Sequence, residues 1–159
     1  MMNQNGSGFL NSIPPVTKNL IIINLLFWVA SLVLPKVGID LVQLLGLHFP
    51  GVKDFYPFQF VTYMFMHDTH SFAHVFFNMF GVYMFGRVLE NVWGPKRFLF
   101  YYIACGIGAG LIQEGVQYIK YIVDYSHYSQ VDIGTGIIPM GEFLNMLTTV
   151  GASGAVYAI

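Results

Sequence analysis

The chain has 159 residues, of which 55% are hydrophobic, 17% aromatic and only 9% charged. Soluble globular domains carry about 25% charged residues, so the composition excludes a soluble domain, and the high apolar content excludes intrinsic disorder. Seven Lys and Arg residues against eight Asp and Glu residues give no basic surface, so we predict no nucleic-acid partner. The remaining class is an all-α polytopic protein integrated in a lipid bilayer. The single cysteine, Cys105, cannot form an internal disulfide.

Windows without charged residues locate the membrane-spanning helices. A hydrocarbon core about 30 Å thick needs roughly 20 mostly apolar helical residues. On this basis we predict complete spans over about 17–36, 69–89 and 96–118, and the first half of a fourth span over 143–159. Because the sequence stops at Ile159 without a flanking charge, we expect the chain to be a fragment truncated after about three and a half transmembrane helices.

The distribution of Lys and Arg predicts the orientation in the membrane. Four of the seven cations lie at the start of the first span or around the short connection between the second and third, namely Lys18, Arg87, Lys96 and Arg97. Because cytoplasmic connections are enriched in cations, residues 1–18 are predicted to be a cytoplasmic tail. Residues 19–159 then form a partial membrane domain of a multi-pass protein in the plasma or inner membrane.

The two long connections differ in character. The first, over 38–66, is rich in Leu, Phe and Tyr and is interrupted by Pro and Gly, which favour short helices and turns. Its apolar side chains need an interface, so we expect it at or within the outer leaflet. The second, over 121–142, is rich in Tyr, Asp and Gly, and we expect a solvated loop there.

The second span contains polar residues that are costly inside a bilayer and are therefore candidates for function. His74 and Asn78 are four residues apart and share one helical face. Their donors either point into a cavity or make a polar contact between helices, and the two residues alone do not decide between these interpretations.

His67, His70 and His74 raise the alternative of a metal site, because three imidazoles at this spacing could converge on one ion. No second group of histidines occurs in the chain. Asp68 and Ser71 also favour a turn rather than a continuous helix between these histidines. We therefore predict no metal and no cofactor, and keep a His-rich metal-binding membrane protein as a minor alternative.

Two groups of small residues stand out further along the chain. The run Gly106 to Gly110 predicts a close-packing face on the third span. Gly151-Ala152-Ser153-Gly154 lies at a predicted helix start, where glycines would let a substrate carbonyl approach a nucleophilic serine. The alternative for Ser153 is close packing alone. The motif is not the nucleophile elbow G-x-S-x-G, because residue 155 is Ala.

The order of these motifs is more specific than any one of them. A membrane-embedded His74-x3-Asn78 is followed by Gly86-Arg87-x2-Glu90, then by a Gly-rich span, and then by GASG at 151–154. Over roughly residues 20–159 the chain resembles the rhomboid family of intramembrane serine proteases. The resemblance implies a rhomboid-like helical bundle with a six-span core, of which this chain would hold the first part.

The resemblance also implies roles for individual residues. Ser153 matches the family nucleophile, with Gly151 and Gly154 completing its motif. His74 and Asn78 match the polar pair that stabilises the oxyanion, together with the Ser153 backbone N–H. Arg87 and Glu90 match a structural network at the cytoplasmic end of the second span, while Gly106 and Gly110 have structural roles. The implied reaction is cleavage of transmembrane helices of other membrane proteins, which must unwind locally to expose a carbonyl.

Three departures from the family pattern bear on activity. The family base is a histidine on its last span, which this sequence does not reach, so residues 1–159 alone are expected to be inactive. Two extra residues separate His67 from His74, and Gln59 stands where some members carry an arginine. A rhomboid-like pseudoprotease that binds membrane helices without cutting them is therefore the main alternative function.

Overall fold

The computed structural model describes residues 12–158 and confirms a predominantly helical membrane protein. Three helical segments have the length and hydropathy to cross a bilayer: Pro15–Val37, Phe72–Trp93 and Pro95–Tyr125. The first and third segments are longer at both ends than the spans predicted over 17–36 and 96–118. The second begins three residues later than the span predicted over 69–89 and also ends later. Residues 1–11 of the predicted cytoplasmic tail, and Ile159, lie outside the described residues.

The first segment consists of α1 (Pro15–Val33) and a 3-10 turn over Leu34–Val37. Pro15 occupies the first helical position, where its missing N–H costs nothing because that group has no partner within a helix. The segment ends at Gly38, whose φ of 83° lies in the left-handed region that glycine adopts readily. Proline and glycine thus set both ends of the first span.

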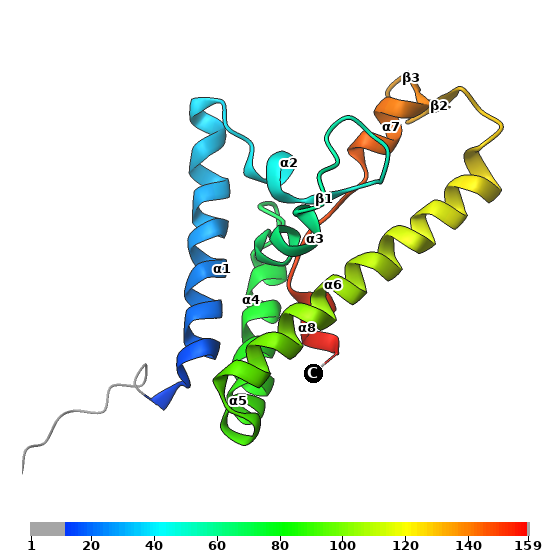
Figure 1. Ribbon diagram of the computed structural model, residues 1–159. Helices are drawn as coiled ribbons and strands as arrows, with labels where there is room; N and C mark the ends of the chain where they lie inside the picture. The colour runs from blue at the N-terminus through cyan, green and yellow to red at the C-terminus, as the bar shows by residue number, and fades with distance from the viewer. Residues whose placement is uncertain (1–11, 159) are drawn as a thin grey trace, which may run out of the picture.

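The second and third segments form a helical hairpin. The second joins α4 (Phe72–Gly81) and α5 (Arg87–Trp93) through a π-helical turn over Val82–Gly86. Gly94, with φ 81°, then reverses the chain into α6 (Pro95–Lys120), which continues as a π-helical turn over Tyr121–Tyr125. In Figure 1, α6 is inclined relative to α1 and α4, so a wedge opens between them toward one end of the molecule.

The first long connection fills this wedge with α2 (Leu41–Leu45), β1 (Leu47–His48) and α3 (Gln59–Thr62), followed by a 3-10 turn over Tyr63–Phe65 (Figure 1). Gln59 is fully buried at its centre. The Gln59 side chain accepts from the backbone N–H of Tyr56 at 3.0 Å and donates to the carbonyl of Asp54 at 2.8 Å. This neutral amide therefore organises the connection through backbone groups.

The second long connection is more ordered than the solvated loop expected over 121–142. After the end of α6, β2 (Gln130–Asp132) and β3 (Ile137–Pro139) form an antiparallel hairpin that leads into α7 (Met140–Met146). Composition suggested a loop because the hairpin is short and largely exposed, and such a strand carries little hydrophobic pattern.

A side-chain network joins α7 to the first connection. One oxygen of the Asp54 carboxylate accepts from Asn145 at 2.7 Å and from Gln43 at 2.9 Å. These hydrogen bonds favour the ionised form and lower the pKa of the Asp54 carboxyl. The buried His48 ring contacts the carbonyl oxygens of Asn145 at 3.2 Å and Gln43 at 2.8 Å. The segment that leads to Ser153 is thus anchored before it enters the bundle.

Residues 143–159 differ from the expected half-span. α7 ends at Met146, and β4 (Thr148–Thr149) pairs antiparallel with β1, with Leu47 opposite Thr149. The chain then turns at Gly151, and α8 (Ser153–Tyr157) begins only at Ser153. In β4, backbone N–H and C=O groups pair with β1 of the first connection, so they are not available for the hydrogen bonds of a continuous helix. The apolar composition alone did not reveal this partner.

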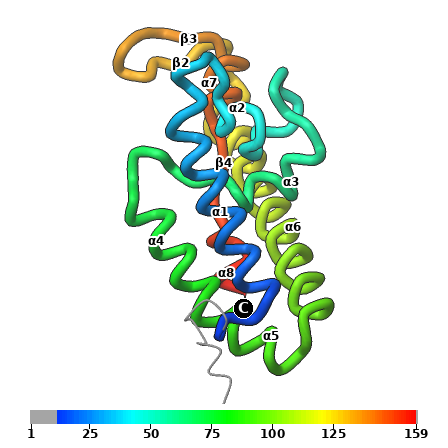
Figure 2. Tube along the Cα trace, turned by 90° about the vertical axis from the view of Figure 1, so that its left-hand side faces the viewer, coloured from blue at the N-terminus to red at the C-terminus, as the bar shows by residue number. Residues whose placement is uncertain are grey.

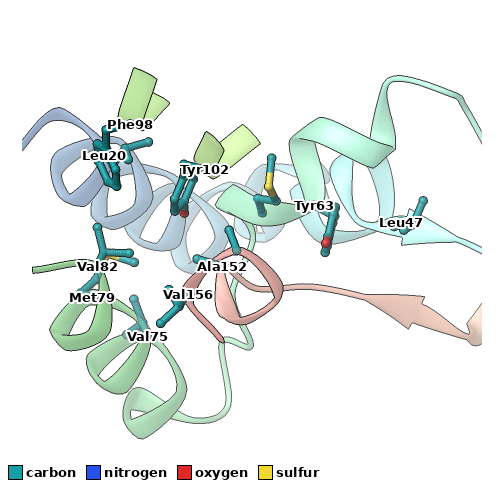
Figure 3. Close-up of a cluster of buried hydrophobic side chains, with 12 residues drawn as sticks. Leu20, Leu47, Tyr63, Val75, Met79, Val82, Phe98, Tyr102, Ala152 and Val156 are labelled. Carbon is teal, nitrogen blue, oxygen red and sulfur yellow. The ribbon is translucent and has the colours of Figure 1, made fainter. Parts of the chain in front are cut away.

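Figures 1 and 2 place α8 between α4 and α6, and Figure 3 shows the core that surrounds it. Side chains from α1, α4, α6, α8 and the first connection meet there, including Leu20, Leu47, Tyr63, Val75, Met79, Val82, Phe98, Tyr102, Ala152 and Val156. Gly81 permits the close approach of α4 to α8, since a Cβ there would lie 2.5 Å from Val156. The core therefore fixes the start of α8 against both neighbouring helices.

Gly106 and Gly110 of α6 were predicted to pack against a neighbouring spanning helix, but they contact the first connection. A Cβ on Gly106 would overlap the sulfur of Met64, and one on Gly110 would lie 3.2 Å from both Leu47 and Tyr63. The absence of a side chain at these two positions therefore allows the first connection to pack closely against α6. Ala109, which lies between them, is one of the α6 residues that meet α8, since a Cβ on Gly154 would lie 2.6 Å from its Cβ.

Glu90 stabilises the bundle, but not through the network expected with Arg87. Its carboxylate is buried and accepts from the backbone N–H groups of Val16 and Thr17 at 2.9 and 2.7 Å, and from the Thr17 hydroxyl at 2.8 Å. It thereby caps α1, which has no side-chain cap of its own. Arg87 donates instead to the Tyr83 hydroxyl at 3.3 Å on the exposed surface.

Candidate active site

One cleft of about 640 Å³ brings together the three polar residues singled out in the sequence. Its lining includes His74 and Asn78 from α4 and Ser153 from α8. Ser153 is more than seventy positions away from His74 and Asn78 in the sequence, and the packing of α8 against α4 makes them neighbours. The rest of the lining is mainly apolar and contains Phe77, Phe80, Phe85 and Val156, among others.

Gly151 lies between His74 and Ser153. Its φ of 119° is rarely adopted by residues with a side chain, and its N–H donates to the Tyr63 carbonyl at 3.0 Å. A Cβ at this position would lie 3.0 Å from Nε2 of His74 and 3.7 Å from Oγ of Ser153. The glycine is therefore required both by the turn and by the space beside the His74 ring.

Gly154 fixes the other side of the serine. A Cβ there would lie 2.6 Å from Cβ of Ala109 and 3.2 Å from the Tyr63 hydroxyl. That hydroxyl donates to the Gly106 carbonyl at 2.7 Å, and burial raises the pKa of Tyr63 to about 12, so it stays protonated. The sequence does not mark Tyr63, because an aromatic residue in an apolar stretch gives no signal of a role next to the GASG turn.

His74 presents its two ring nitrogens to different surroundings. Nδ1 accepts a hydrogen bond from the backbone N–H of Asp68 at 3.3 Å, whereas Nε2 faces Gly151. A neutral imidazole carries one N–H, and the nitrogen that accepts cannot carry it. The hydrogen of neutral His74 therefore lies on Nε2, on the side of the ring that faces Gly151.

Asn78 is buried, with 6% of its surface exposed. Its Nδ2 donates to the His74 carbonyl at 2.8 Å, one helical turn back. An amide nitrogen carries two hydrogens, and this bond uses one of them. The Oδ1 atom of Asn78 is buried without a hydrogen-bond partner.

The three histidines considered as metal ligands do not form such a site. The His67 and His74 rings lie with centroids 5.4 Å apart, while His70 is exposed. Within residues 12–158, no three His, Cys, Asp or Glu side chains are placed to hold a metal ion. Burial, with a contribution from His74, lowers the pKa of His67 to about 4, so its ring is neutral at physiological pH.

Fold and cleft together define a polytopic membrane protein with a serine at a helix start, facing two polar donors from a second helix. The family model of the Rhomboid domain matches residues 54–159, about two thirds of the chain. The chain therefore belongs to the rhomboid family, whose members are generally intramembrane serine proteases. Among curated proteins, no match to the chain is found.

Proposed function

We propose that this protein is an intramembrane serine endopeptidase in which Ser153 is the nucleophile and His74 and Asn78 stabilise the oxyanion. The supporting observation is the single cleft that holds all three side chains, with Gly151 leaving space between the serine and Nε2 of His74. Membership of the rhomboid family supports the reaction class.

The first chemical step follows from these positions. Oγ of Ser153 attacks the carbonyl carbon of a substrate peptide bond, and the carbonyl oxygen becomes an oxyanion as the tetrahedral intermediate forms. The Nε2–H of His74 and the second N–H of Asn78 donate to that oxygen. A general base must take the serine proton, and the family resemblance assigns this role to a histidine on a later span.

The proposed substrates are transmembrane helices of other membrane proteins. The cleft is bordered by Phe77, Phe80 and Phe85, all of which are at least 48% exposed and offer an apolar surface to a segment within the bilayer. A helical substrate carbonyl is already hydrogen-bonded, so the segment must unwind before Ser153 reaches it.

We further propose that the N-terminus and the α5–α6 turn are cytoplasmic, because Lys18, Arg87, Lys96 and Arg97 cluster at that end. Single cysteines placed at Lys53 and at Lys96 in a Cys105→Ala background test this orientation. In intact cells, an impermeant thiol reagent should label the cysteine at position 53 and not the one at position 96. The reverse pattern would contradict the proposal.

Cleavage of a reporter transmembrane helix by the intact protein in membranes tests the enzymatic proposal. The Ser153→Ala variant should release no product. Ser71→Ala is the matched control, because Ser71 lines the same cleft but lies at the start of α4. Equal cleavage by Ser153→Ala and the unchanged protein would refute the assignment.

A second candidate is a rhomboid-like protein that binds membrane helices without cutting them. Membership of the rhomboid family fits both functions. The same reporter distinguishes the two functions. A reporter helix that crosslinks in the cleft, but is never cleaved by the intact protein, would identify the non-cleaving function.

A further inference from the structure

A tight turn precedes the second span and approaches the His74 ring. Asp68 Oδ1 accepts from the backbone N–H of His70 at 2.8 Å, a side-chain-to-backbone bond two residues ahead that closes an Asx turn. The turn fixes the Asp68 backbone, whose own N–H donates to Nδ1 of His74 at 3.3 Å. The carboxylate of Asp68 thus acts on His74 only through the main chain.

The direction of this hydrogen bond decides which face of the imidazole is a donor. A backbone N–H can only donate, so Nδ1 must present its lone pair. In the other tautomer, two hydrogens would meet between Asp68 and His74. The lone pair of Nε2 would then face the oxyanion and repel it.

Two further contacts restrict the His74 ring and backbone. The ring of His67 lies against it at a centroid distance of 5.4 Å and an interplanar angle of 57°. Nδ2 of Asn78 donates to the His74 carbonyl, and the His74 N–H donates to the Ser71 carbonyl at 3.1 Å. Among these contacts, only the Asp68 N–H distinguishes the two ring nitrogens.

We propose that Asp68 is a positioning residue, whose Asx turn selects the Nε2–H tautomer of His74 and so aims a donor at the oxyanion. Its effect on catalysis rests on the proposed function, since it requires that His74 stabilise the oxyanion. The tautomer itself is measurable without activity, so the two proposals can fail separately.

Nitrogen-15 NMR of the intact protein with labelled histidine imidazoles tests the proposal at alkaline pH, where the rings are neutral. The signal of His74, among five histidines, is assigned by its loss in His74→Gln. We expect the Nε2–H form in the unchanged protein and in Asp68→Asn, whose amide oxygen also closes the turn. Asp68→Ala should give a mixture of both forms. Thr69→Ala, in the same turn, is the control and should match the unchanged protein.

Reporter cleavage supplies the functional readout. Asp68→Ala should lower kcat about tenfold to a hundredfold with KM unchanged, below the 10²–10³ expected for removal of an oxyanion donor, and Asp68→Asn should restore kcat. An Nδ1–H form of His74 in the unchanged protein would overturn the proposal without any variant. The same tautomer in Asp68→Ala as in the unchanged protein would also overturn it. Failure of Ser153→Ala to abolish cleavage would refute the enzymatic function and leave the tautomer result intact.

Discussion

Replacement of Glu90 by alanine tests how the first span is held to the rest of the bundle. The Glu90 side chain is 3% exposed and accepts two backbone N–H groups and one hydroxyl at the N-terminal end of α1. Hydrogen bonds to a charged group contribute about 1.5–3 kcal/mol each, and the negative charge also favours a helix N-terminus. Loss of the two backbone bonds alone therefore predicts a decrease of about 3–6 kcal/mol in the free energy of unfolding.

The assay is unfolding of the purified protein in mixed micelles, followed by circular dichroism as the fraction of denaturing detergent rises. Thr17→Val removes only the hydroxyl bond and should cost about 1.5–3 kcal/mol. Arg87→Gln, on the same helix as Glu90, is the control and should change stability by less than about 0.5 kcal/mol, because its side chain is exposed. If Glu90→Ala unfolds at the same point as Arg87→Gln, the carboxylate does not hold α1.

Three further variants address packing, the turn and pH. Gly106→Ala should lower the free energy of unfolding by about 1–3 kcal/mol, because the added Cβ overlaps the Met64 sulfur. Gly108→Ala is the control, because its Cβ enters open space. Equal shifts of the unfolding temperature in the two variants would contradict this packing. Gly151→Ala should cost about 1–3 kcal/mol in backbone strain and reduce reporter cleavage, and full cleavage would show that the turn tolerates a side chain. Burial lowers the pKa of His67 from 6.5 in the unfolded chain to about 4 in the folded protein. The contribution of His67 to the free energy of unfolding should therefore be complete above about pH 6.5 and fall by about 3 kcal/mol toward pH 4. In a detergent titration, His67→Phe should remove this part of the decline. The same pH dependence in His67→Phe as in the unchanged protein would refute the role of His67.

The sequence predicted the parts of the fold that depend on hydrophobic pattern. The spans and the polar face of His74 and Asn78 followed from helical periodicity and from the cost of polar groups in a bilayer. The pairing of β1 with β4 did not, because two-residue strands carry no periodic signal and their partners are a hundred residues apart. That pairing is why α7 stops at Met146 and α8 begins only at Ser153, in place of one continuous helix over 143–159.

Partners of individual polar groups were equally hidden in the sequence. The family resemblance placed Arg87 and Glu90 in one structural network, yet Glu90 bonds to Thr17 at the start of α1 while Arg87 bonds to Tyr83. Tyr63 meets the GASG turn through its backbone carbonyl, which accepts from Gly151, and through its hydroxyl, which lies beside Gly154. Backbone acceptors exist at every residue, so no sequence pattern marks the ones that are used.

The central claim is that Ser153 is a nucleophile activated in the cleft that it shares with His74 and Asn78. Labelling of the intact protein with a fluorophosphonate probe tests it most directly, because the probe reacts with the activated serine and mimics the oxyanion. We predict modification of Ser153 alone, no labelling of Ser153→Ala, and labelling slowed about 10²–10³-fold when either His74 or Asn78 is replaced by alanine. Equal labelling of Ser153→Ala and the unchanged protein would contradict the claim.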